Sequence, residues 1–144
     1  MTSIAASAGQ VVFIPKDGSS YFYESFECQP AVTNGYGGIK FTVQGPAGAS
    51  FALELQTAAN CSVTDGTYKS SYNVVTDLTG ERQTVTLPLL GFDNEPNYDA
   101  IVGLVWAVFS KTGVQWSIGN IELICGDVAA PQTTSMILSC SINT

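Results

Sequence analysis

The chain contains no histidine, although it carries carboxylates that could take part in catalysis. Without histidine, the Ser-His-Asp and Cys-His nucleophilic mechanisms are excluded, together with the commonest zinc ligand. Hydrolysis of a glycosidic bond needs only two carboxylates, and the candidates are Glu24, Glu27, Glu54, Asp99 and Glu122. Their spacing marks out no pair. We therefore expect no catalytic residues and no enzymatic activity, and a two-carboxylate glycosidase is the remaining enzyme class.

A second group of residues combines aromatic rings with planar amides, carboxylates and lysine. Sugars present flat apolar faces ringed by hydroxyl groups, so aromatic rings can cover the faces while polar side chains hydrogen-bond the hydroxyls. We expect the following residues to contact a carbohydrate: Tyr21, Tyr23, Lys40, Glu54, Gln56, Tyr72 and Trp106.

Several of these assignments compete with ordinary structural roles. Tyr21 and Tyr23 alternate with Phe22 in SYFYESFEC, so both point outward, but strand tyrosines can be half-buried without any ligand. Trp106 lies in IVGLVWAVF, which is apolar on both faces. It is therefore expected either in the core or on a face that a ligand covers. Trp116 alternates with apolar neighbours and is predicted to belong to the core.

Two runs of alternating apolar and polar residues, 38–44 and 50–56, flank a loop rich in glycine and small residues. This period of two predicts half-buried β-strands, with Lys40 on the polar side of the first and Glu54 and Gln56 on the polar side of the second. If the runs pair as a hairpin, Lys40 lies opposite Glu54. If they belong to opposing sheets, Lys40 and Glu54 are not paired, but each strand still has one apolar side and one polar side. Both arrangements are open.

Two loops share features with ligand-binding motifs. The NGYGG turn around Tyr36 lacks the following helix that a phosphate-binding loop requires. The segment 93–99 is rich in oxygen ligands but lacks the glycine and terminal glutamate of an EF-hand loop; its candidates are Asp93, Asn94, Glu95, Asn97 and Asp99. We expect no cofactor and no metal, with a structural calcium ion in this segment as the open alternative.

Four cysteines, Cys28, Cys61, Cys125 and Cys140, lack the close CxxC spacing of metal sites. An even number of cysteines favours two disulfides, whose connectivity the sequence leaves open, and disulfides indicate an oxidising compartment. The alternative is four buried thiols in a cytosolic protein. Asn60-Cys61-Ser62 fits the glycosylation sequon. We therefore expect a secreted, extracellular protein that is glycosylated at Asn60.

Composition limits the partners. The 144 residues carry a formal net charge of −7, and only 12% are charged. Nucleic acids and anionic membranes are bound through basic patches, so neither is expected as a partner. No apolar run approaches the ~18 residues of a membrane span. The expected partners are neutral or cationic.

Short apolar runs recur between turn signals, and no helical period persists. The expected fold is all-β, a two-sheet β-sandwich in one domain over 1–144. A linker-like segment at 126–134 precedes a tail at 135–144 that is tied back as a strand. The predicted strands are 10–14, 20–28, 38–44, 50–56, 71–76, 83–88, 100–109, 115–118, 121–125 and 135–141.

Four segments, in this order, resemble a known family: ESFECQP, YGGIKFTVQGPAGASFALELQTAANC, TVTLPLLGF and VQWSIGNIELIC. They are similar to the jelly-roll, galactose-binding-like accessory domains, akin to carbohydrate-binding modules, of secreted fungal polysaccharide deacetylases and related carbohydrate-active enzymes. The resemblance implies a non-catalytic sandwich that binds a glycan through one sheet or its loops. Asn120 stands where such domains carry an aspartate associated with structural calcium.

These observations lead to one expected function and one alternative. The expected function is non-catalytic anchoring to a polysaccharide or oligosaccharide of the cell-wall type, such as β-glucan, chitin or chitosan, by a monomer or a module appended to an enzyme. The alternative is a structural or protein-interaction domain of a secreted or surface protein.

Overall fold

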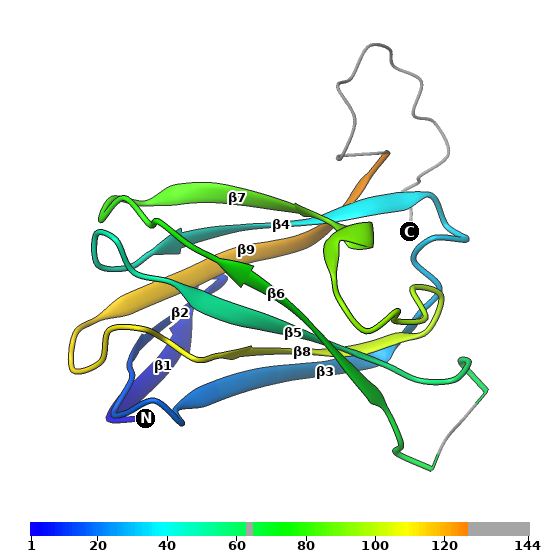
Figure 1. Ribbon diagram of the computed structural model, residues 1–144, viewed down its shortest axis with the longest axis horizontal. Coiled ribbons are helices and arrows are strands. Elements are labelled where there is room, and N and C mark those ends of the chain that lie inside the picture. Colours follow the sequence, from blue (N-terminus) through cyan, green and yellow to red (C-terminus); the bar gives the residue numbers. More distant parts are fainter. Residues whose placement is uncertain (63–64, 127–144) are drawn as a thin grey trace.

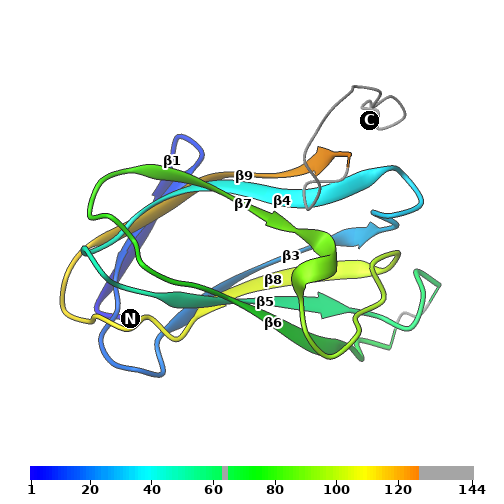
Figure 2. The same cartoon turned by 45° about the horizontal axis from the view of Figure 1, so that its top comes forward.

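The computed structural model describes residues 1–62 and 65–126, which form a two-layer β-sandwich of the jelly-roll type. Within these residues, one sheet has five strands in the order β1-β2-β9-β4-β7, and the other has four in the order β3-β8-β5-β6. Figures 1 and 2 show β4, β7 and β9 in one layer and β3, β5, β6 and β8 in the other. The predicted all-β sandwich is confirmed.

All neighbouring strands in both sheets are antiparallel. The five-stranded sheet contains β1 (Ser3–Ser7), β2 (Gln10–Ile14), β9 (Trp116–Cys125), β4 (Tyr36–Gln44) and β7 (Gln83–Pro88). The four-stranded sheet contains β3 (Tyr21–Gln29), β8 (Ile101–Ala107), β5 (Phe51–Thr57) and β6 (Lys69–Val75). A short 3-10 helix, η1 (Leu89–Gly91), follows β7.

The two alternating runs of the sequence fall into different layers. β4 belongs to the five-stranded sheet and β5 to the four-stranded sheet. The hairpin pairing is therefore wrong, and Lys40 does not lie opposite Glu54. The alternative arrangement is confirmed, because each run still turns its apolar side toward the interior between the sheets.

Two features of the strand pattern differ from the prediction. The predicted strands 115–118 and 121–125 form one strand, β9, which continues through Asn120 at a φ of 52° and a register shift against β4. Such a bulge lets one strand keep pairing while its side chains change face. β1 was not predicted, because its five residues are all exposed and show no apolar alternation. The predicted tail strand and Cys140 lie outside the described residues.

Aromatic rings fill the interior between the sheets. Trp106 is completely buried, with its ring centroid 5.0 Å from that of Phe41 and 6.0 Å from that of Phe22. Trp116 is also buried, 5.1 Å from Phe109 between ring centroids. Burial of such large apolar side chains supplies most of the favourable free energy of folding. The predicted core position of Trp116 is confirmed.

A disulfide between Cys28 and Cys61 joins the end of β3 to the loop after β5. None of the cysteines among residues 1–62 and 65–126 is a free thiol. In that same part of the chain, no helix is long and apolar enough to cross a membrane.

Candidate functional site

The outer face of the four-stranded sheet collects most of the predicted contact residues. Leu53, Leu55 and Trp106 point into the core, so their alternating neighbours point outward. We call this outward surface the tyrosine face; the strand registers assign to it Tyr21, Tyr23, Ser25, Ala52, Glu54, Gln56, Ser70, Tyr72, Val74, Gly103, Val105 and Ala107.

The central row of the tyrosine face runs across all four strands. Tyr23 on β3 pairs with Val105 on β8, Val105 with Glu54 on β5, and Glu54 with Tyr72 on β6. Neighbouring strands lie about 4.8 Å apart, so the two tyrosines are separated by roughly 14 Å at the backbone. This row places an aromatic ring at each edge of the sheet and a carboxylate between them.

The two flanking rows differ in polarity. On one side, the registered residues are Tyr21, Ala107, Ala52 and Val74, which are aromatic or apolar. On the other side they are Ser25, Gly103, Gln56 and Ser70, which are small or hydrogen-bonding. The face therefore has one apolar border and one polar border.

Hydrogen bonds organise the polar part of the face. Ser70 Oγ donates to Glu54 Oε2 at 2.7 Å, and Gln56 Nε2 donates to the same oxygen at 3.2 Å. Gly103 leaves room for the Gln56 amide, because a Cβ at this position would lie 2.8 Å from Gln56 Oε1. The three polar side chains are thus fixed relative to one another before any ligand arrives.

The tyrosines, in contrast, are available to a partner. The exposed fractions are 57% for Tyr21, 63% for Tyr23 and 44% for Tyr72. No hydrogen bond joins their hydroxyl groups to any other described residue. A tyrosine in this state offers both a ring face and a free hydroxyl group.

Two predicted contact residues do not belong to this face. Trp106 has an exposed fraction of 0%, so its predicted role in ligand contact is wrong, and the competing core assignment is correct. Lys40 lies on β4, in register with Thr86 and Glu122 of the other sheet. The hairpin alternative, which would have placed Lys40 opposite Glu54, does not hold because β4 and β5 belong to different sheets. The structure brings together the other five: Tyr21, Tyr23, Glu54, Gln56 and Tyr72.

Sequence reasoning missed Ser70, Gly103 and Val105. Ser70 follows the polar, serine-rich loop, and its role depends on the register of β6 against β5. Gly103 and Val105 lie in an apolar run that shows no outward side. Gly103 itself was the one available signal in this run, since a glycine inside a strand often marks a site that a ligand or another part of the chain approaches closely.

The outer face of the five-stranded sheet is also polar, and the described residues near its centre carry no aromatic ring. The described partners of Lys40 and Thr42 on the adjacent strands are threonine, glutamate and glycine residues. Thr42 Oγ1 donates to the carbonyl of Gly119 at 3.1 Å and accepts from Asn120 Nδ2 at 3.3 Å. None of these described residues is aromatic, so they offer hydrogen bonds without a ring on which a sugar could stack.

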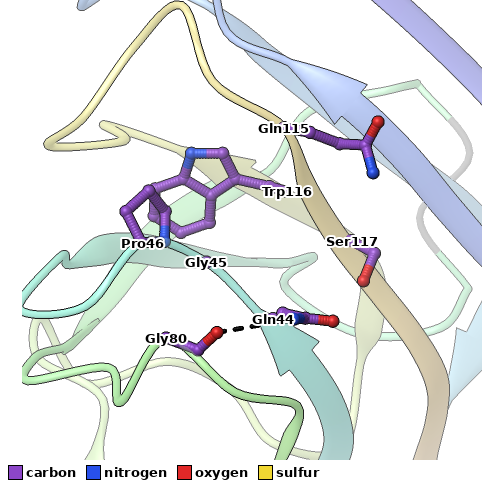
Figure 3. Close-up of a pocket in the computed structure, with 7 residues that line it drawn as sticks. All are labelled: Gln44, Gly45, Pro46, Gly80, Gln115, Trp116 and Ser117. Atoms are coloured by element: carbon purple, nitrogen blue, oxygen red, sulfur yellow. Dashed lines mark hydrogen bonds between the residues drawn. The ribbon is translucent and has the colours of Figure 1, made fainter.

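A pocket of about 220 Å³ lies at the end of this sheet, where Gln44, Gln115 and Ser117 border it (Figure 3). Gln44 Nε2 donates to the carbonyl of Gly80 at 3.4 Å. The Trp116 ring beside the pocket is almost completely buried and donates through its indole nitrogen to the Lys111 carbonyl. No exposed aromatic surface therefore faces this pocket from Trp116, and we do not assign it as the principal site.

The side chains of the oxygen-rich segment 93–99 form hydrogen bonds to the backbone of neighbouring strands and loops. Asp93 Oδ1 accepts from the Tyr72 backbone at 2.8 Å, and Asp99 Oδ1 accepts from the backbone N–H of Thr33. Asn97 Nδ2 donates to the Ala59 carbonyl at 2.8 Å. Within the described ranges, no group of three His, Cys, Asp or Glu residues could hold a metal ion.

Comparison with known proteins gives matches at the level of structure. No family model matches the sequence, and no curated protein matches it. A family 11 carbohydrate-binding module from Clostridium thermocellum, solved with a beta-1,3-1,4-mixed-linked tetrasaccharide, superposes with a TM-score of 0.62 at 14% identity, over 87% of this chain and 82% of that one.

Two further solved structures have the same architecture. A family 30 carbohydrate-binding module has a TM-score of 0.60 at 11% identity, over 87% of this chain and 83% of that one. The family 11 module of the Clostridium thermocellum cellulosomal cellulase Lic26A-Cel5E has a TM-score of 0.60 at 16% identity, over 86% and 80% of the two chains. At such low identity the likeness lies in the fold: this chain has the jelly-roll sandwich found in carbohydrate-binding modules of families 11 and 30.

Proposed function

We infer that the protein is a non-catalytic carbohydrate-binding domain that holds a polysaccharide chain on the tyrosine face. The observation that carries this proposal is the central row, with Tyr23 and Tyr72 at opposite edges and Glu54 between them. The shared fold with carbohydrate-binding modules supports it. We further propose that the domain acts outside the cell, in keeping with its disulfide.

A glycan lying across the strands would use both kinds of group. Sugar rings would stack on the exposed tyrosines, while their hydroxyl groups would bond Glu54, Gln56 and Ser70. The apolar side of the face would contact the carbon-bound hydrogens of the sugar. Because the polar side chains already bond one another, little conformational entropy is lost when the ligand binds.

The same arrangement argues against hydrolysis. Glu54 is the one carboxylate among the described residues of the three rows. Glycosidases require two carboxyl groups on either side of the scissile bond. The tyrosine face therefore binds without reacting.

Retention on insoluble or immobilised β-glucan, cellulose, chitin and chitosan tests the proposal. We expect wild-type protein to be retained by at least one polymer and Tyr23→Ala/Tyr72→Ala to be released, because both aromatic contacts are lost. Tyr68→Ala is the matched control, since Tyr68 has an exposed fraction of 55% and lies outside the rows. Absence of retention on every polymer contradicts the proposal and favours a protein-interaction domain. Equal loss in both variants contradicts the assignment of the face.

A further inference from the structure

We propose that the preferred ligand is a polysaccharide of amino sugars with free amino groups, whose ammonium group pairs with the Glu54 carboxylate. This inference rests on the proposed function and specifies the ligand of the same face. It is carried by three observations: the absence of lysine and arginine from the described rows of the face, the hydrogen bonds of Glu54, and the position of the carboxylate between the tyrosines.

No lysine or arginine belongs to the described rows of the tyrosine face. Lys40 is on the five-stranded sheet, and Arg82 donates to Gln10 Oε1 of that sheet at 3.0 Å. Lys69 Nζ donates to the carbonyl of Glu95 and Lys111 Nζ to that of Ala47. Among the described residues, no lysine or arginine forms an ion pair with the Glu54 carboxylate, in a chain whose formal net charge is −7.

The hydrogen bonds of Glu54 leave one carboxylate oxygen for a ligand. Both donors, Ser70 Oγ and Gln56 Nε2, are neutral and bond Oε2. Among the described residues, Oε1 has no hydrogen-bond donor. Glu54 is partly buried on β5, and a carboxylate withdrawn from water is stabilised by an opposite charge. A ligand cation would supply that charge.

The surroundings favour an ammonium group on a sugar over other cations. An ammonium has three donors, so it can bond Glu54 Oε1 and neighbouring hydroxyl groups together. Tyr23 and Tyr72 flank the carboxylate in register, and aromatic faces attract ammonium groups as well as sugar rings. These contacts favour a polymer whose flat sugar rings carry ammonium groups.

Isothermal titration with three soluble oligosaccharides of equal length tests this inference: glucosamine, N-acetylglucosamine and β-linked glucose oligomers. We expect wild-type protein to bind the glucosamine oligomer about tenfold more tightly than the acetylated one, and Glu54→Gln to remove that preference. Glu122→Gln is the matched control, since it removes the same charge from the other sheet, where Glu122 lies in register with Lys40. It should leave the preference intact.

The outcomes separate the inference from the proposed function. If neutral oligomers bind as tightly as the glucosamine oligomer, or if Glu54→Gln and Glu122→Gln reduce binding equally, the amino-sugar inference fails while carbohydrate binding stands. If no oligomer binds, carbohydrate binding fails as well. If polylysine competes fully with the glucosamine oligomer, the face recognises charge without recognising sugar, which also overturns the inference. The thermal unfolding midpoint of each variant checks that it remains folded.

Discussion

Gly103 shows how one missing side chain shapes the tyrosine face. A Cβ here would lie 2.8 Å from Gln56 Oε1 and 3.1 Å from the Glu24 carbonyl oxygen. The glycine is therefore needed for the Gln56 amide to lie over β8 while it donates to Glu54. Gly103, which has no side chain, thus positions the Gln56 amide for its hydrogen bond to Glu54.

We expect Gly103→Ala to weaken oligosaccharide binding about five- to tenfold, because displacing Gln56 costs a hydrogen bond of about 1 kcal/mol. The free energy of unfolding should fall by no more than about 1–2 kcal/mol, as for modest overpacking. Titration calorimetry and urea denaturation measure the two effects. Gly18→Ala is the control, since no atom lies within 4 Å of its added Cβ; an unchanged affinity in Gly103→Ala would show that Gln56 does not contact the ligand.

At the scale of strands, the alternation of apolar and polar residues predicted most strands and their buried sides. Which strands pair, and in which sheet, depends on contacts between residues far apart in the sequence. A period of two identified the apolar side of β4 and β5, which is a local property of each strand. The sheet to which each strand belongs depends on partners far away in sequence, such as β8 for β5. This is why Glu54, Gln56 and the tyrosines were predicted individually, while their registered row and the exclusion of Lys40 were not.

The apolar strand β8 shows a second limit of sequence reasoning. Trp106 and Val105 are adjacent in a run that is apolar on both sides, and only the structure shows that Trp106 points into the core. Val105 points outward, yet it is buried because side chains of the neighbouring strands surround it. The composition of a central strand therefore does not reveal which of its sides points away from the core.

The disulfide acts on edge strand β3, which carries Tyr21 and Tyr23. Because Cys28 and Cys61 are 33 residues apart, their bond restricts the unfolded chain considerably. We expect Cys28→Ser/Cys61→Ser to lower the free energy of unfolding by about 2–4 kcal/mol. Chemical denaturation of the variant and of wild-type protein measures the difference. An unchanged stability would show that this bond does not constrain the unfolded state.

At the scale of the whole molecule, the tyrosine face exists only in the folded state. Its residues come from four strands between Tyr21 and Ala107, so the unfolded chain has no comparable site. Ligand binding must therefore stabilise the native protein. An oligosaccharide at 100 times its dissociation constant should contribute about 2.7 kcal/mol.

For a domain of this size, we expect that stabilisation to raise the unfolding midpoint by roughly 5–10 °C. Differential scanning calorimetry with increasing oligosaccharide concentration measures it. The shift should be absent in Tyr23→Ala/Tyr72→Ala and present in Tyr68→Ala. A bound ligand that leaves the midpoint unchanged would indicate that the unfolded chain binds it equally well.

The unequal borders of the tyrosine face have a consequence for a bound polymer. One border is apolar and the opposite border is polar, and Tyr21 and Tyr23 lie on one edge strand while Tyr72 lies on the other. No rotation within the plane of the sheet superposes this pattern on itself. A polysaccharide also has a direction, from its reducing to its non-reducing end. We therefore expect the domain to bind the polymer in one orientation relative to the polymer's reducing end. Any domain covalently linked to it would then have the same orientation along a fibre.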